Sequence, residues 1–439
     1  MLLLFFFLLL LQGVVYIVII PPWQSPDEPT HFEYVYLMAH SGLLPGRVVP
    51  DYDLQKEVII SLDKYNFWAY VGVERPQPLP DRFQDCPFLV GAFTQIGQKP
   101  FLYYWLASFP FRVMPSIPLT GAMYGLRALS LVFSLITVYL VYRTAREIFP
   151  RDFFFSLTSA ALAGLLPQFM LIGTSVSLDP LINLVGAAVI FLLIKSSRNG
   201  FSPTRSVFTL LLLAAGILIT YKAFTLVLIA LVGLLIIGGE KGKSPRLFRR
   251  WGWSVPGGLI CLLLGYLVLT RLQPQTARAL VLKVSDFFYT TIGGLGANNG
   301  YWPGYWHWFQ RELIASFWLK FGWLRFEMAS PIYLVIKMIS ALSALGIVII
   351  FIKRLIGKSS LAPVRMACMG ILVSSALIVL LVFCLQWGLK WPVTSVQGRH
   401  LFIVISAWSI LFVLGRHELV FLRYRNKLYF PLGGFMVFT

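Results

Sequence analysis

Charged side chains are scarce in this sequence of 439 residues. Asp, Glu, Lys and Arg together make up 13% of the chain, whereas hydrophobic residues make up 58%. Soluble globular proteins carry about 25% charged residues, so this scarcity excludes an ordinary soluble domain. Several apolar runs approach or exceed the roughly 18 residues that span a bilayer. We therefore expect one all-α integral membrane domain over residues 1–439.

Signatures of several familiar catalytic sites are also missing. The sequence has no P-loop, no glycine-rich dinucleotide turn, no HExxH motif and no Cys/His spacing typical of zinc. The four cysteines are scattered without metal-binding or redox spacing. Nucleotide-driven chemistry on the cytoplasmic side therefore has no sequence support.

Ten apolar runs predict membrane-spanning helices. The first lacks a basic start and a small-residue exit, so we interpret it as a retained span and not as a cleaved signal peptide. Basic residues fill the loops after the second, fourth, sixth, eighth and tenth runs, and the positive-inside rule assigns these loops and both termini to the cytoplasm. The net charge of +19 then needs no nucleic-acid partner. The runs are residues 2–20, 122–142, 153–173, 176–195, 206–220, 223–238, 253–270, 332–352, 364–387 and 400–415.

The stretch 206–238 could form one long helix, but basic clusters flank both of its ends. It must therefore cross the membrane twice, with Thr220, Tyr221 and Lys222 at the outer turn. Each arm is short, which favours tilted or partly interfacial helices. Residues 428–439 are apolar but too short to span, and we leave them unassigned.

Two long segments, 21–121 and 271–331, then fall on the outer side. Ten of the eighteen acidic residues lie between Asp27 and Asp85, so the first loop is an acidic module. Proline interrupts its later part, 98–118, which we interpret as aromatic helices lying in the membrane interface. The second loop is dense in Trp, Tyr and Phe, as aromatic belts at head-group depth often are.

The first loop opens with "PPWQSPDEPTHFEYVYLMAHSGLLP" (21–45). Ser25, Pro26 and Glu28 fit a capping box with Ser at N-cap, Pro at N1 and Glu at N3. A helix start does not explain Asp27 and His31, which share one face with Glu28 at helical spacing. The helix dipole keeps a carboxylate ionised there. Asp27 could then bind a metal ion or accept a proton from an attacking hydroxyl.

Further charged residues stand at the predicted outer ends of spans. Asp179 precedes Pro180 and is either a helix cap or a site residue. Arg127 and Lys222 oppose the positive-inside bias, so they either snorkel to the interface or form a cationic pocket for an anionic head group.

The stretch "VTSVQGRHLF" (393–402) opens the last span with Gln397, Arg399 and His400. An arginine at the membrane edge is an apt bidentate phosphate ligand. Lys99, Tyr103 and Tyr104, in "KPFLYYWL", are weaker candidates because aromatic interface packing accounts for them well.

Together these features resemble the GT-C superfamily of membrane glycosyltransferases, which contains protein O-mannosyltransferases and aminoarabinose transferases. The resemblance rests on Pro-Asp-Glu-x-x-His after the first span, "KPFLYYWL", an Arg-led second span, and the outer Asp179 and Lys222. "SFWLKFGW" (316–323) and "VQGRH" (396–400) are similar to a bacterial polytopic family formerly described as a domain of unknown function. His400 departs from the pattern, in which Tyr follows Gln-Gly-Arg.

The resemblance implies a GT-C-like bundle of about 10–11 transmembrane helices in a bacterial inner membrane. It implies a polyprenyl-phosphate-linked sugar donor and transfer on the outer face to a glycan, lipid or protein acceptor. The catalytic acid of the family falls on Asp27, with Glu28 beside it. A divalent cation such as Mg²⁺ or Mn²⁺ at Asp27, Glu28 and His31 is left open.

The residues themselves fit such a transfer. Arg127, Lys222 and Arg399 could hold the donor phosphate and stabilise the leaving group, with His31, Lys99, Tyr103, Asp179, Gln397 and His400 around the substrate. Asp27 could serve as base, and the aromatic stretches 65–70 and 301–309 could stack on sugars. With one candidate carboxylate group, we expect a single, inverting displacement. The alternatives are a transporter or flippase of lipid-linked saccharides, which needs polar residues deep within spans, and an O-antigen ligase-like or polymerase-like enzyme.

Overall fold

The computed structural model is almost entirely helical. It describes residues 1–40, 49–86, 99–114, 117–240, 266–268, 270–278, 281, 302–321, 325–358, 361–385 and 396–419. Its elements are α1 (Leu2–Ile19), α2 (Glu28–His40), α3 (Tyr52–Lys64), α4 (Phe67–Val71), η1 (Phe83–Asp85), α5 (Leu102–Ala107), α6 (Phe109–Val113), α7 (Leu119–Ile148), α8 (Phe153–Gly164), α9 (Pro167–Gly173), α10 (Asp179–Asn199), α11 (Pro203–Ile219), η3 (Tyr221–Ala223), α12 (Phe224–Glu240), α16 (Trp302–Trp318), β1 (Lys320–Phe321), β2 (Phe326–Glu327), α17 (Ser330–Leu355), α18 (Pro363–Phe383), η5 (Gly398–Val404) and α19 (Ile405–Leu419).

The described residues contain seven helical segments that are long and apolar enough to cross a membrane, against ten expected spans. One expected span is the pair α8 and α9, which is bent by 64°. Pro167 causes the break, because it cannot donate a helical hydrogen bond and disfavours helical backbone at Leu166 before it. A second, α11, has only 17 residues. The expected span 253–270 lies largely outside the described residues.

The expected hairpin at 206–238 is confirmed. Helix α11 ends at Ile219, Thr220 has extended backbone, and the short η3 turns the chain into α12. Lys222 therefore lies at the turn between two apolar helices. This turn lies beside the start of α10, where Lys222 pairs with Asp179.

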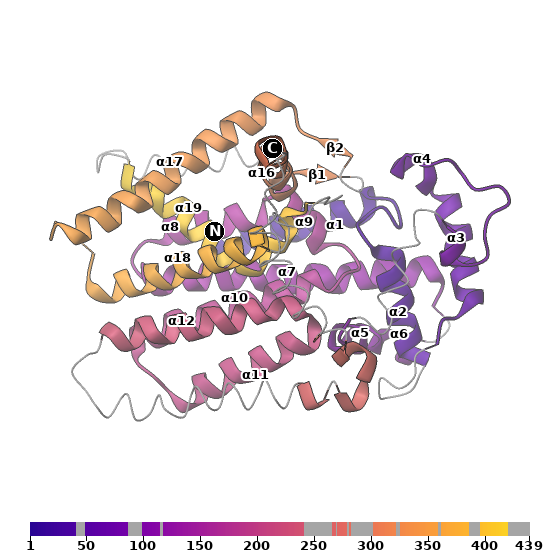
Figure 1. Ribbon diagram of the computed structural model, residues 1–439, viewed down its shortest axis with the longest axis horizontal. Helices are drawn as coiled ribbons and strands as arrows, with labels where there is room; N and C mark the ends of the chain where they lie inside the picture. The colour runs from indigo at the N-terminus through magenta and orange to yellow at the C-terminus, as the bar shows by residue number, and fades with distance from the viewer. Residues whose placement is uncertain are drawn as a thin grey trace.

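The long helices form a bundle whose interior contains α7, α10 and α19 (Figure 1). A Cβ atom at Gly186 in α10 would lie 1.9 Å from the backbone oxygen of Ile403 in η5. Glycine thus lets η5 pack directly on α10, and this brings the two charged helix starts together. Helices α1 and α17 are peripheral. Only 17% and 22% of the residues in an apolar 18-residue stretch of each helix are buried. Their apolar surfaces would face lipid.

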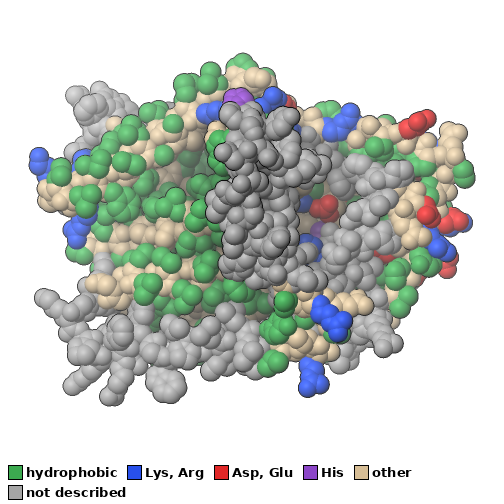
Figure 2. Space-filling view, viewed as in Figure 1, with side chains coloured by type: hydrophobic (Ala, Val, Ile, Leu, Met, Phe, Trp, Pro, Cys, Tyr) green, Lys and Arg blue, Asp and Glu red, His purple; other side chains and the backbone are tan. Residues whose placement is uncertain are grey.

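Helices α2 to α6 lie at one end of the bundle, in indigo and violet at the right of Figure 1. The antiparallel pair β1–β2 reaches the same region, where the ring of Phe326 lies 5.6 Å from that of Tyr70 in α4. In Figure 2 the red acidic side chains of the visible face gather toward this end, while the bundle to the left is mainly green and tan.

The opposite end of the bundle collects basic residues from several loops. Lys353 pairs with Glu418 at 2.6 Å, and Arg198 of α10 donates to the carbonyl of Glu147 in α7. The Arg365 guanidinium lies 5.3 Å from the ring centroid of Phe149. The expected grouping of basic loops at one end is therefore present, and the acidic module lies at the other.

Candidate active site

The start of α2 differs from the expected capping box. The helix begins at Glu28, and Asp27 has a left-handed backbone with φ of 62°. The Glu28 carboxylate accepts from the backbone N–H of Ser25 at 3.4 Å, so half of the box forms. Because Asp27 precedes the helix and is left-handed, Asp27 and Glu28 do not share a helix face. A non-glycine residue in this conformation is uncommon and often marks a functional position.

Glu28 forms a buried ion pair with Arg127 of α7. The guanidinium Nε and Nη2 donate to the two carboxylate oxygens at 2.9 and 2.7 Å, and the two side chains are 0% and 1% exposed. The other guanidinium N–H groups donate to the carbonyls of Ile17, Ile20 and Pro21. Glu28 also accepts from the backbone N–H of Val176 at 3.1 Å.

This pairing corrects two expectations from the sequence. All five N–H groups of Arg127 have protein acceptors, so none is left for a donor phosphate. Glu28 is enclosed beside it and has no open face for catalysis. Both residues instead tie the end of α1 and the start of α2 to α7. They hold the backbone that carries Asp27.

Asp27 pairs with a different arginine. Its Oδ2 accepts from Nη2 of Arg399 at 2.6 Å, and the Asp27 side chain is 35% exposed whereas that of Arg399 is 8% exposed. Arg399 Nε lies 3.5 Å from Oδ2 of Asp179. Within the described residues, the buried Nε and Nη1 atoms of Arg399 make no hydrogen bond. Buried donors without a partner are rare in native interiors, so these two nitrogens need an explanation.

Asp179 does not cap α10, and its carboxylate faces other charged side chains. Leu178 occupies the N-cap position of α10, and no side chain caps this helix. The Asp179 carboxylate lies 3.7 Å from Nζ of Lys222 as well as near Arg399. Nζ of Lys222 is also 2.7 Å from Nδ1 of His400. The starts of α10, η3 and η5 thus converge on one charged cluster.

Lys99 and His31 complete this cluster from the first outer segment. Lys99 Nζ lies 5.4 Å from the ring centroid of Tyr221. His31 is 4% exposed, and its Nδ1 is 2.9 Å from the hydroxyl of Tyr104. Tyr103, a predicted substrate contact, is instead 1% exposed and bonds Ser130. It is buried, and the charge of Asp179 in the cluster acts on its hydroxyl.

Burial and neighbouring charges set the protonation of the groups outside the spans. Burial alone would raise the pKa of Asp27, but Arg399 and other positive groups outweigh it and hold the pKa below its usual value. Burial lowers the pKa of His31 to about 4, although Asp27 acts in the opposite direction. Burial also lowers the pKa of Lys99. At neutral pH Asp27 is therefore an anion and His31 is neutral.

Backbone contacts hold η5 in place beside α16. The N–H of Gly398 donates to the Ser316 hydroxyl at 2.8 Å, and a Cβ at this glycine would lie 2.4 Å from the backbone nitrogen of Phe317. Only glycine fits so close an approach. Next to it, the buried Oε1 of Gln397 has no hydrogen-bond partner among the described residues.

The residues expected to hold a metal ion do not converge. Glu28 binds Arg127, His31 contacts Tyr104 through Nδ1, and Asp27 binds Arg399. No group of three or more His, Cys, Asp or Glu side chains suited to a metal ion occurs in the part of the chain that the structure describes. In this structure the three side chains at which a divalent cation was left open each bind another protein group instead.

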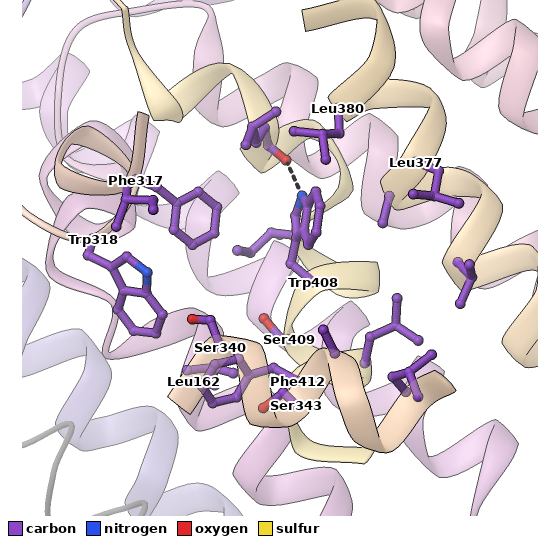
Figure 3. A pocket seen from close by; sticks show the side chains of 18 of the residues that line it. Leu162, Phe317, Trp318, Ser340, Ser343, Leu377, Leu380, Trp408, Ser409 and Phe412 are labelled. Atoms are coloured by element: carbon purple, nitrogen blue, oxygen red, sulfur yellow. Dashed lines mark hydrogen bonds between the residues drawn. The ribbon is translucent and has the colours of Figure 1, made fainter. Parts of the chain in front are cut away.

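An apolar cavity of about 540 Å³ lies beside η5, with Leu401 of η5 in its wall (Figure 3). Helices α8, α16, α17, α18 and α19 contribute to its wall, including Phe317, Trp318 and Trp408. Leu401, two residues after Arg399, lines it and accepts a hydrogen bond from the Trp408 indole at 3.2 Å. Its polar lining consists of serines such as Ser340 and Ser409. The η5 segment therefore joins the charged cluster to an apolar chamber.

Sequence reasoning missed one part of this site. Tyr34 and Gln273 support Tyr104, which in turn contacts His31. Residues from three separate segments meet there, so no local pattern in the sequence could have revealed the contact.

Comparison with known proteins supports the resemblance. The family of dolichyl-phosphate-mannose-protein mannosyltransferases matches residues 98–269, which is less than half of the chain. No curated protein matches the sequence.

Two solved structures of the oligosaccharyltransferase from Archaeoglobus fulgidus share the fold. The apo form matches with a TM-score of 0.52 at 12% identity, covering 99% of this chain and 54% of that one. The same enzyme, AglB, in complex with an inhibitory peptide and a dolichol-phosphate, matches with a TM-score of 0.53 at 10% identity, covering 99% and 54%. ArnT from Cupriavidus metallidurans, bound to undecaprenyl phosphate, matches with a TM-score of 0.45 at 14% identity, covering 96% and 61%.

The chain therefore has the fold of a GT-C membrane enzyme, and the family match supports a glycosyltransferase of this kind. It spans about half the length of the solved structures.

Proposed function

We propose that the protein is a glycosyltransferase that moves a sugar from a polyprenyl-phosphate-linked donor to an acceptor hydroxyl. The observation that carries the proposal is the state of Arg399. Its guanidinium is buried, is held by Asp27 on one side, and retains two nitrogens without a hydrogen-bond partner among the described residues. A phosphate would supply the missing acceptors in the planar geometry that arginine prefers.

The surrounding charges favour an anionic group. Lys99, Lys222 and Arg399 bring three positive charges to two carboxylates, those of Asp27 and Asp179. The leaving group of the proposed reaction is a phosphate, which gains negative charge as the glycosidic bond breaks. Fixed cations stabilise that charge most strongly where water is excluded. The cluster thus suits the leaving group better than it suits a neutral ligand.

Asp27 is suited to act on the acceptor. It is the more exposed partner of its ion pair, and its lowered pKa keeps it ionised at neutral pH. In a single displacement the acceptor oxygen bonds to the anomeric carbon as the carbon–oxygen bond to the phosphate breaks. The acceptor proton passes to Asp27, and the bonding electron pair leaves with the phosphate. This step inverts the anomeric carbon.

The apolar cavity suits the hydrocarbon tail of such a donor. It lies beside η5, so a lipid whose phosphate reaches Arg399 would place its chain toward Leu401 and Trp408. The cavity is lined almost wholly by apolar side chains, as a hydrocarbon chain requires. Because the metal ligands expected at Asp27, Glu28 and His31 do not converge, we assign no step of the transfer to a cation.

The location and acceptor form part of the same proposal. The basic loops at the far end of the bundle would face the cytoplasm, as the positive-inside rule expects. The charged cluster would then lie on the outer face of a bacterial plasma membrane. A glycan, a lipid or a protein could supply the acceptor hydroxyl.

Binding of a polyprenyl phosphate tests the phosphate site. The protein is reconstituted in nanodiscs, and the lipid is titrated into wild type, Arg399→Gln and Lys353→Gln, a control at the opposite end of the bundle. We expect Arg399→Gln to weaken binding at least about tenfold, as loss of a charge-assisted pair does, while the control binds normally. Equal binding by both variants, or none by wild type, contradicts the proposal.

Transfer is tested with radiolabelled polyprenyl-phosphate sugars and a panel of acceptors. Formation of a glycosylated acceptor supports the enzyme. Movement of the intact lipid-linked sugar between leaflets, with no new glycosidic bond, would identify a flippase instead.

A further inference from the structure

Tyr104 occupies a fixed position beside His31. The ring of Tyr34 stacks on it with centroids 4.0 Å apart, and the ring of Tyr103 meets it edge-on at 5.2 Å. All three tyrosines are buried. The Tyr34 hydroxyl accepts a hydrogen bond from Nε2 of Gln273 at 2.5 Å, which anchors the stack to a distant segment. The Tyr104 hydroxyl is therefore held at one place on α5.

The hydrogen bond between Tyr104 and His31 has a definite direction. Within the described residues, Nδ1 of His31 is the only hydrogen-bond partner of the Tyr104 hydroxyl, at 2.9 Å. Burial raises the pKa of Tyr104 well above its usual value, so the phenol keeps its hydrogen. A buried phenolic hydrogen needs an acceptor, and Nδ1 is the acceptor at hand. A neutral imidazole that accepts at Nδ1 carries its own hydrogen on Nε2.

We propose that Tyr104 is a positioning residue whose hydroxyl fixes His31 in the tautomer with hydrogen on Nε2. The imidazole then presents a neutral N–H donor to the charged cluster. This assignment rests on the proposed function, because it concerns how His31 serves the transfer at Asp27.

The surroundings of His31 explain why the tautomer matters. The backbone N–H of His31 donates to the carbonyl of Asp27 at 3.1 Å, so the two residues lie one turn apart. The charges that act on its ring belong to the adjacent Asp27 and, from three other segments, to Lys99, Asp179 and Arg399. An Nε2–H group can donate to a carboxylate or to a substrate oxygen in this cluster. The other tautomer would turn a lone pair toward the same oxygens and repel them.

Nitrogen-15 NMR of histidine-labelled protein reads the tautomer directly. The chain has five histidines, and His31→Asn identifies the signal of His31. In wild type at neutral pH we expect Nε2 to be protonated and Nδ1 to be bare. In Tyr104→Phe, which keeps the ring and its stacking, we expect a mixture of both tautomers. Thermal unfolding verifies that the variant is folded.

Tyr36→Phe is the matched control. Tyr36 lies on α2, its ring stacks on His40 at 4.1 Å, and its hydroxyl makes no hydrogen bond within the described residues. We expect the control to leave both the His31 signal and the rate of transfer unchanged. Tyr104→Phe should lower kcat by about three- to tenfold, the effect of one hydrogen bond, with little change in KM for the lipid donor.

The outcomes separate this inference from the proposed function. Protonation of His31 at Nδ1 in wild type, or an unchanged tautomer in Tyr104→Phe, overturns the role of Tyr104. An altered tautomer with wild-type kcat also overturns it, because the tautomer would then not matter for transfer. If the tautomers are as expected but the protein transfers no sugar, the proposed function is wrong. The role of Tyr104 in setting the hydrogen position on His31 is then still supported.

Discussion

Asp27 and Glu28 are neighbours in the chain, and each pairs with an arginine from a distant helix. The Glu28–Arg127 pair is sealed, with both side chains at most 1% exposed and every guanidinium N–H bonded. The Asp27–Arg399 pair is open, with Asp27 35% exposed and two nitrogens of Arg399 lacking hydrogen bonds among the described residues. Two carboxylate–arginine pairs one position apart thus differ in whether the protein satisfies all their hydrogen-bond donors.

The difference separates an ion pair that is fully satisfied within the protein from one that has donors left over for a ligand. A buried pair is retained when each donor and acceptor is matched, because a single unmatched charge is costly to bury. The open pair keeps donors that are unmatched among the described residues, and in the proposed function a phosphate supplies their acceptors. The left-handed backbone of Asp27 also fits this reading, because it turns the carboxylate away from Arg127 and toward the start of η5.

The largest effect is expected when the open pair loses its carboxylate. Asp27→Asn should reduce sugar transfer by about 10²–10⁴-fold, the usual contribution of a general base. The amide keeps the shape of the side chain, so the thermal unfolding temperature should stay close to that of wild type. Asp63→Asn, at a partly exposed residue paired with Arg75, is the control and should transfer normally. Full activity in Asp27→Asn would remove Asp27 from the mechanism.

Breaking the sealed pair should affect folding first. Arg127→Met leaves the Glu28 carboxylate buried without a counter-ion, and we expect it to lower the free energy of unfolding by about 3–5 kcal/mol. Unfolding by SDS in mixed micelles measures this loss. Adding Glu28→Gln to Arg127→Met removes the stranded charge and should restore part of the stability. A fully stable Arg127→Met protein would show that the pair is dispensable.

Glu33 of α2, a third acidic residue after Asp27 and Glu28, is buried without a positive partner among the described residues, so its effect on stability should depend on pH. Glu33 is 1% exposed and accepts from the neutral Gln55 at 2.6 Å, and burial raises its pKa to about 7. The stability contributed by protonated Glu33 is fully present below its ordinary pKa and is lost as the pH rises through 7.

Glu33→Gln should remove this loss. The variant should gain on the order of 3 kcal/mol over wild type above pH 7, at about 1.4 kcal/mol for each unit of pKa shift, and nothing near pH 4. Unfolding curves recorded at both pH values measure the difference. An equal gain at both would mean that Glu33 does not titrate in this range.

The sequence was informative where a charge stands at the end of an apolar run. A charged residue at such a position needs an explanation whatever its partners are. The sequence therefore identifies Asp179, Lys222 and Arg399 as candidate site residues. The structure brings these three together at one end of the bundle. The apolar runs and the turn at Lys222 likewise follow from hydropathy and charge alone.

The partners of these residues could not be read from the sequence. Glu28 and Arg127 are 99 positions apart, and only the approach of the first residue of α2 to α7 shows that they satisfy each other. The pattern Ser-Pro-Asp-Glu predicts helix from Pro26, but tertiary bonds to Glu28 and Asp27 override that local preference. The contact between His31 and Tyr104 spans 73 positions and has no local signature.

The central claim is that the open pair is a phosphate site in which Asp27 performs the chemistry. It is tested most directly by titrating polyprenyl phosphate into Asp27→Asn protein in nanodiscs. Removing the carboxylate frees Arg399, so the variant should bind the lipid at least as tightly as wild type although it transfers no sugar. Loss of binding in Asp27→Asn would contradict the account, because Asp27 would then be needed to hold the site together.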